Sequence, residues 1–221
     1  MMLRSDVAKI NREAMFQRTF ISSFNLMKLA NIMYSQWPEI FAKLYGFTST
    51  LFTNMDSGGK LIMYGNGGSA ADCDHIVGEF RGRFILNRPS VEAISLSDSM
   101  ATVTAIANDF GYEKVFSHQL DGITKSCDSI IALTTSGTSK NIVSSLYNVK
   151  HRYPSINSLI ITGQMGVFSD FFKYHIQIPI TCQKNTVARI QEMTMFLLHT
   201  MCFIFDGLYE DHMYGPREAV D

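Results

Sequence analysis

The chain has 221 residues, and its 19 Lys and Arg against 20 Asp and Glu give a formal net charge of −1. That length suits one domain with a sizeable core. A hydrophobic fraction of 46% with 15 Gly and 5 Pro excludes disordered and collagen-like proteins. A general nucleic-acid binder needs a surplus of basic residues, so the charge balance argues against a nucleic-acid partner. A small anion can still bind to a near-neutral chain if backbone dipoles hold it.

The first 55 residues are expected to form a helical N-terminal arm. Apolar residues recur there at helical spacing, and Pro38 suits the first turn of a second helix. The spaced residues are Phe16, Phe20, Phe24, Met27, Ile40, Leu44, Phe47 and Leu51. Turn-forming residues follow at 56–59.

Short apolar runs then alternate with helical stretches, which is typical of βαβ units and a parallel sheet. We predict strands at 61–64, 93–96, 129–134, 158–162 and 176–180, and a last helix over 186–209. The expected fold is a three-layer α/β sandwich around a five-stranded parallel sheet. We expect a single domain over 1–221, with its α/β core at 60–211. Ligands of such sheets bind beyond the carboxyl ends of the strands, so the search for chemistry begins in those loops.

The first such loop, residues 65–69, follows the first strand and contains Asn66, Gly67 and Ser69. Glycines let the backbone approach a ligand, and the next helix offers free N–H groups. The loop also fits a loose dinucleotide fingerprint, but neither Glu92 nor Asp98 is placed to hold a ribose. A glycine-rich turn without any ligand is the remaining alternative. We therefore expect no nucleotide cofactor.

The second loop, residues 134–139, follows a strand and precedes a helix. Its hydroxyls at Thr134, Thr135, Ser136 and Ser139 can donate to a phosphate together with the backbone. A purely structural explanation uses Ser139 as N-cap and Gly137 for the turn, but leaves Thr134 and Ser136 without a role. Neither loop ends in Gly-Lys-Ser/Thr, so a small phosphorylated ligand is favoured over a nucleoside triphosphate.

Four polar residues on two predicted helices are candidates for acid–base or metal chemistry. His75 and Glu79 share one helix face, and Gln191 and His199 lie on the last helix. A histidine among apolar neighbours is often only a core residue, and a His–Glu pair is often only a surface contact. Together the four residues are suited to hold zinc or a similar ion, or to move protons.

Other segments indicate the compartment. The four cysteines, Cys73, Cys127, Cys182 and Cys202, form no Cys-x-x-Cys pair, as is common for reduced thiols. The first 16 residues have no apolar core before a cleavage site, so we expect no signal peptide. Residues 195–205 are interrupted by His199 and have about half the length of a bilayer span. We expect a cytoplasmic protein without a membrane partner.

Four motifs resemble the sugar-isomerase (SIS) domain family, and within it the phosphoheptose isomerases. They are GNGGSAADCDHIVGEFRGRF at 65–84, AIANDFG at 105–111, TTSGTS at 134–139 and ARIQEMTMFLLH at 188–199. The resemblance covers residues 35–210. It implies a homotetramer with active sites between subunits. It also implies interconversion of sedoheptulose 7-phosphate and D-glycero-D-manno-heptose 7-phosphate, supplying heptose for lipopolysaccharide or capsule.

The resemblance also implies roles for single residues. Glu79 matches the family's catalytic glutamate and His199 its catalytic histidine. The zinc-binding positions are matched by His75, Glu79, Gln191 and His199. The substrate contacts, to which Glu79 and Gln191 also belong, are matched by Asn66, Gly67, Ser69, Asn108, Asp109, Thr134, Thr135, Ser136 and Ser139.

One departure from the family pattern is Ala188, where some of these enzymes have an aspartate. A non-catalytic SIS protein that binds a sugar phosphate or a protein partner is an alternative, although retention of Glu79 and His199 weighs against it. Further alternatives are an SIS isomerase of another sugar phosphate and a nicotinamide-dependent oxidoreductase. We hypothesise that Glu79 is the base and His199 the opposed acid in an enediol mechanism.

Overall fold

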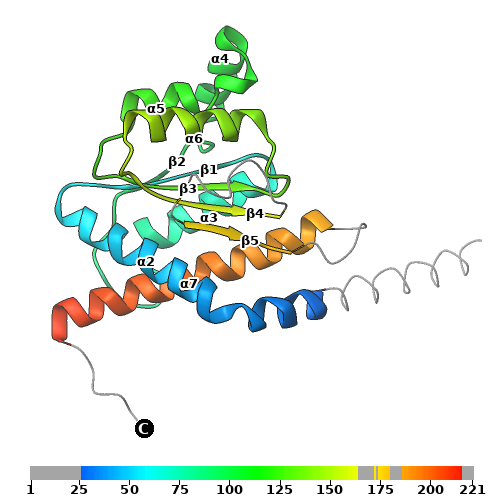
Figure 1. Cartoon of the computed structure of the whole chain (residues 1–221). Helices are drawn as coiled ribbons and strands as arrows, with labels where there is room; N and C mark the ends of the chain where they lie inside the picture. Colours follow the sequence, from blue (N-terminus) through cyan, green and yellow to red (C-terminus); the bar gives the residue numbers. More distant parts are fainter. Residues whose placement is uncertain (1–25, 164–171, 173, 180–185, 216–221) are drawn as a thin grey trace, which may run out of the picture.

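The computed structural model describes residues 26–163, 172, 174–179 and 186–215. It has a five-stranded parallel sheet with strand order β2-β1-β3-β4-β5 (Figure 1). The strands are β1 (Leu61–Gly65), β2 (Ala93–Ser95), β3 (Ser129–Thr134), β4 (Asn157–Thr162) and β5 (Tyr174–Gln177). The α/β sandwich predicted from the alternating pattern is confirmed.

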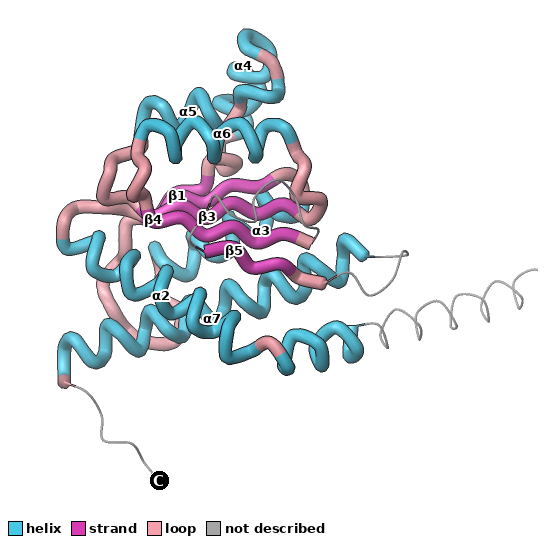
Figure 2. The backbone as a smooth tube through the Cα atoms, viewed as in Figure 1, coloured by secondary structure: helices cyan, strands magenta, loops and turns pink. Residues whose placement is uncertain are grey.

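The three central strands are buried at every position, because helices cover both faces of the sheet. Alternate residues of each strand enter separate cores: Leu61 and Met63 of β1 belong to one, Ile62 and Tyr64 to the other. The first core is shared with α2, α3 and α7, and the second with α5 and α6. Figure 2 shows these two helical layers on opposite sides of the strands.

Residues 26–35 are helical and are followed by a series of helices along the chain. These are α2 (Trp37–Asp56), α3 (Gly68–Arg81), α4 (Met100–Phe110), the 3-10 helix η1 (Tyr112–Lys114), α5 (Ser117–Ile123), α6 (Lys140–Arg152) and α7 (Thr186–Tyr214). Pro38 lies in the first turn of α2 as predicted, since its missing N–H has no helical partner there. Gly58, with φ of 75°, forms the turn after α2.

Two predicted boundaries are wrong. The last strand was predicted at 176–180 but begins at Tyr174 and ends at Gln177, because β4 pairs from Leu159↔Tyr174 to Thr162↔Gln177. Beyond it, Pro179 has no N–H for a strand ladder. The last helix continues past residue 209 to Tyr214. Phe16, Phe20 and Phe24 lie outside the described residues, as does Cys182.

No helix in the described part of the chain is long and apolar enough to cross a membrane. Cys73, Cys127 and Cys202 are free thiols.

The carboxyl ends of β1 and β3 lie side by side, with Gly65 paired to Leu133. The two predicted anion loops therefore leave the sheet next to each other.

Candidate active site

The first loop turns tightly from β1 into α3. Gly67 has φ of 57°, which suits glycine, and α3 begins at the next residue. A Cβ at Gly65 would lie 2.9 Å from the backbone of Ser69, so the first turn of α3 packs directly on the end of β1. Ser69 is buried. The structure thus brings Asn66, Gly67 and Ser69 together at the sheet edge.

Asn66 joins the two loops. Its side-chain amide donates to Asn141 Oδ1 at 2.9 Å and accepts from Asn141 Nδ2 at 2.9 Å. The Tyr112 hydroxyl donates to the same Asn66 oxygen at 2.8 Å. Sequence reasoning missed Asn141 and Tyr112, although each lies within three residues of a predicted substrate contact. These contacts fix the amide between α6 and η1.

Three hydroxyls of the second loop form a triangle. The Thr134 hydroxyl oxygen lies 3.5 Å from that of Ser136 and 3.4 Å from that of Ser139, and the last two are 3.4 Å apart. Gly137, with φ of 68°, turns the chain beneath them and donates its N–H to Thr134. Ser139 occupies the N-cap position of α6 without a side-chain cap bond. Its hydroxyl is therefore available to a ligand at the positive end of that helix.

The other predicted contacts are more peripheral. Thr135 is partly buried but outside the hydroxyl triangle. Asn108 and Asp109 are exposed near the end of α4, where Asn108 Nδ2 donates to Asp109 Oδ1 at 2.8 Å. Their role in substrate binding stays a prediction.

The helices α3 and α7 bring His75, Glu79 and His199 into one cluster. The Nε2 atoms of the two histidines are 3.1 Å apart, and His75 Nε2 is 3.5 Å from Glu79 Oε1. One ligand atom from each residue lies within 4.8 Å of the others. The ring of Phe84 stacks on His199 at 5.6 Å, with an interplanar angle of 15°. The structure thus brings the predicted pair of α3 close to His199 of α7, and the roles of the three residues stay a prediction.

These distances fit a divalent metal. Ligands about 2.0–2.2 Å from a tetrahedral zinc ion lie about 3.3 Å from one another, close to the two separations in the cluster. Two imidazoles and a carboxylate are also a donor set that zinc prefers. The side chain of Gln191 lies against the start of α3, where a Cβ at Gly68 would lie 2.1 Å from Gln191 Nε2. Gln191 therefore borders the first loop, and its place as a fourth ligand stays a prediction.

Burial affects two titratable groups beside the cluster. It raises the pKa of Asp72, whose Oδ2 is buried without a hydrogen-bond partner among the described residues, while nearby His75 opposes the shift. Burial, with the charges of Glu79 and Asp206, raises the pKa of Cys202 to about 12. In the absence of a metal, the Cys202 thiol therefore stays protonated at neutral pH.

Comparison with known proteins identifies the family of the chain. The SIS domain family matches residues 27–155. A phosphoheptose isomerase of Geotalea daltonii is 32% identical over 84% of this chain and 92% of its own, and phosphoheptose isomerase 2 of Campylobacter jejuni is 38% identical over 72% and 75%. The structure of phosphoheptose isomerase from Neisseria gonorrhoeae matches with a TM-score of 0.72 at 25% identity, covering 87% of this chain and 98% of that one. The chain therefore belongs to the SIS domain family, in its phosphoheptose isomerase branch, and is an isomerase.

Proposed function

We propose that the protein converts sedoheptulose 7-phosphate into D-glycero-D-manno-heptose 7-phosphate through an enediol. The observation that carries the proposal is the cluster of His75, Glu79 and His199, formed by α7 and by α3, the helix that begins at the first anion loop. Relatives of the protein are named phosphoheptose isomerase, and the cluster contains the acid–base groups that the reaction needs.

In the mechanism, Glu79 moves a proton between two carbons of the substrate. Its carboxylate removes a proton from C1 of the ketose, while His199 donates a proton to the carbonyl oxygen at C2, which gives the enediol. Glu79 then returns its proton to C2, and His199 takes back a proton from the C1 hydroxyl, which leaves the aldehyde. One carboxylate and one opposed imidazole thus complete the transfer without a net change in protonation.

The cluster also supports a zinc site. His75, Glu79 and His199, with Gln191 as the fourth ligand, would hold the ion. Bound zinc would polarise the oxygens at C1 and C2 and so lower the cost of the developing negative charge.

The phosphate docks on the hydroxyl triangle of Thr134, Ser136 and Ser139, at the amino end of α6. The first loop and the exposed pair Asn108 and Asp109 contact the sugar. Because the phosphate takes no part in the reaction, its binding serves to orient C1 and C2 of the substrate toward Glu79.

The direct test is conversion of sedoheptulose 7-phosphate by purified protein, with the aldose product followed over time. Glu79→Gln and His199→Ala are each expected to lower kcat by about 10²- to 10⁴-fold, the usual contribution of a general acid or base. Glu92→Gln is the matched control, because Glu92 is exposed, precedes β2 and belongs neither to the cluster nor to either anion loop. Near-native turnover of the Glu79→Gln protein would contradict the assignment. If the native protein is active only on another sugar phosphate, the substrate assignment is wrong but the proposed mechanism still holds.

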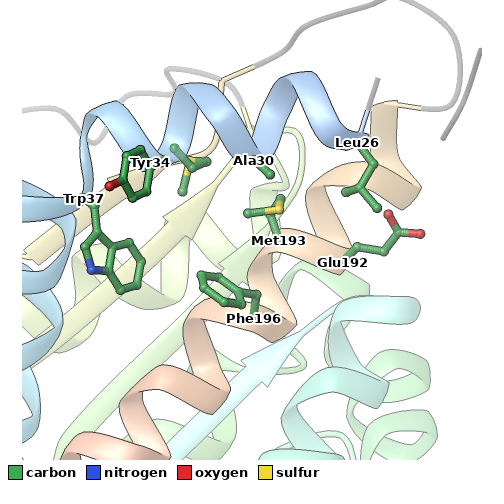
Figure 3. Close-up of a pocket in the computed structure, with 8 residues that line it drawn as sticks. Leu26, Ala30, Tyr34, Trp37, Glu192, Met193 and Phe196 are labelled. Carbon is green, nitrogen blue, oxygen red and sulfur yellow. The ribbon is translucent and has the colours of Figure 1, made fainter. Parts of the chain in front are cut away.

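The proposed assembly is a homotetramer. Four aromatic side chains form a continuous band over α2 and α7: Trp37, Phe41, Tyr45 and Phe196, with neighbouring ring centroids 5.7–6.3 Å apart. Phe41, Tyr45 and Phe196 are 40%, 47% and 51% exposed. Beside the band, a cavity of about 410 Å³ lies between residues 26–37 and α7, lined mainly by apolar side chains (Figure 3). A contiguous apolar surface of this kind favours a second copy of the chain as its cover.

The proposal extends to the setting of the reaction. Free cysteines suit a reducing compartment, so we place the protein in the cytoplasm. We take it to be one domain with its core at 60–211; of the predicted arm at 1–55, residues 1–25 lie outside the described residues. Its product would supply heptose for lipopolysaccharide or capsule.

A further inference from the structure

A buried ion pair joins the loop after α3 to α7, and these two helices carry the cluster. Arg88, in the loop between α3 and β2, donates from Nε to Asp206 Oδ1 on α7 at 2.9 Å. The two side chains are only 1% and 8% exposed. A buried pair is retained at a desolvation cost, so its place in the fold merits a specific explanation.

Arg88 also completes the end of α3. Its Nη2 donates to the carbonyl of Glu79 at 3.1 Å, and its Nη1 donates to the carbonyl of Phe80 at 3.0 Å. Carbonyls in the last turn of a helix have no partner within the helix, and a cation there complements the helix dipole. The guanidinium therefore holds the backbone of the residue that carries the proposed catalytic carboxylate.

Asp206 holds the same loop from the other side. Its Oδ2 accepts the backbone N–H of Ile85 at 3.0 Å and of Leu86 at 2.9 Å. Asp206 follows His199 by seven residues, two helical turns on about the same face of α7. Phe84, in this loop, stacks on the His199 ring. The pair thus connects Glu79 on α3 with His199 on α7 through one short segment.

We propose that Arg88 and Asp206, here called the clamp, are positioning residues that set the separation of α3 and α7 and hence the geometry of His75, Glu79 and His199. This inference rests on the proposed function, because it assigns the clamp to the metal site of that function. Neither residue touches substrate, and both act through the helices that they join.

A second buried pair provides a matched control for stability. Lys60 Nζ lies 2.8 Å from Asp128 Oδ2, with side chains 9% and 0% exposed. Asp128 also accepts two backbone N–H groups, from Lys60 and Lys125. This pair precedes β1 and β3, and its hydrogen bonds are to neither α3 nor α7. Its loss is expected to lower stability as clamp loss does, without a change in the cluster.

The experiment compares Arg88→Lys and Asp206→Asn with Lys60→Arg and Asp128→Asn in the full chain. Lysine keeps the charge of Arg88 but not the planar fork that reaches Asp206 and two carbonyls at once. Both clamp variants are expected to bind cobalt(II) about 10- to 100-fold more weakly than native protein, the usual effect of removing an outer-shell partner. Crystal structures of the metal-free variants are expected to show a longer His75 Nε2–His199 Nε2 separation. The control variants are expected to melt earlier with unchanged cobalt affinity.

Each outcome is decisive. If the single variants do not fold, Arg88→Met with Asp206→Leu removes both buried charges together and so leaves neither charge unpaired. A folded clamp variant with native cobalt affinity and native histidine separation would overturn the inference. Failure of the native protein to bind cobalt would contradict the proposed metal site instead. In that case the His75 Nε2–His199 Nε2 separation in the metal-free crystal structures would alone test whether the clamp positions the cluster.

Discussion

The Nε2 atoms of His75 and His199 lie 3.1 Å apart, although 124 residues separate the two histidines in the chain. Two ring nitrogens at this distance share either a proton or a cation, since two protonated imidazoles would place like charges together. Glu79 Oε1, 3.5 Å from His75, adds a negative charge to the same point. The arrangement therefore favours one cation held between the two helices.

Removal of metal is expected to lower the melting temperature, and added zinc is expected to restore it. Binding to the folded state alone stabilises it by about 2.7 kcal/mol when free zinc is about 100 times its Kd. His75→Ala is expected to abolish the zinc response in a thermal-shift assay. His151→Ala, which removes an exposed histidine of α6, serves as control and should respond like native protein. An equal response from both variants would disprove the site.

Loss of one hydroxyl from the triangle is expected to weaken phosphate binding. Thr134→Val, Ser136→Ala and Ser139→Ala should each cost about 1.5–3 kcal/mol, because each removes a hydrogen bond to a charged group. The measurements are KM for the sugar phosphate and the inhibition constant of inorganic phosphate. Thr138→Ala, at an exposed position in the same loop, should leave both constants unchanged. Inhibition constants that stay native in all three variants would place the phosphate elsewhere.

Alanine at two glycines of α3 is expected to have different effects: lower activity at Gly68 and higher stability at Gly78. A methyl group at Gly68 would overlap the Gln191 amide and displace it from the first loop, so Gly68→Ala should lower kcat/KM. A Cβ at Gly78 meets no described atom within 4 Å, so Gly78→Ala should stabilise the helix by about 0.5–1 kcal/mol. Steady-state kinetics and urea unfolding separate the two effects. Native kinetics of Gly68→Ala would show that the position of Gln191 is unimportant.

Much of the fold was predictable because local patterns determine it. Buried parallel strands are continuous apolar runs, so β1 and β3 were located within one residue of their bounds. The edge strand β5 alternates between buried and half-buried residues, and only its pairing with β4 fixes the register. Its bounds were therefore beyond a prediction from apolar runs alone.

The site was predictable where its residues follow one another in the sequence. The two loops and the pair His75 and Glu79 lie within short motifs with a clear physical signal. The contact of Asn66 with Asn141 spans 75 residues, and that of Arg88 with Asp206 spans 118. Such contacts arise from tertiary packing, and no local spacing indicates them.

Stability is expected to fall as the pH drops below about 6.5, partly because of His175. Burial lowers the pKa of this histidine, and the charge of Lys43 adds to the shift. Below about 6.5 the unfolded chain binds a proton that the folded protein does not, so the free energy of unfolding decreases with falling pH. His175→Gln should reduce this decrease in denaturant titrations between pH 8 and pH 5. His151→Gln, at an exposed position, should follow the native curve, and a His175→Gln curve parallel to the native one would refute the assignment.

A charge in the aromatic band is expected to dissociate the proposed tetramer. Phe41 contacts Trp37 and Tyr45 by its ring, and Phe41→Asp would place an unpaired carboxylate where two copies meet. Stable interfaces bury about 800 Å² on each partner, so one central charge is enough to break a contact of that size. Sedimentation velocity should show a tetramer for native protein and smaller species for Phe41→Asp. Phe110→Asp, 57% exposed on α4 and outside the band, should sediment as native protein does. A Phe41→Asp protein that stays tetrameric would move the interface away from α2.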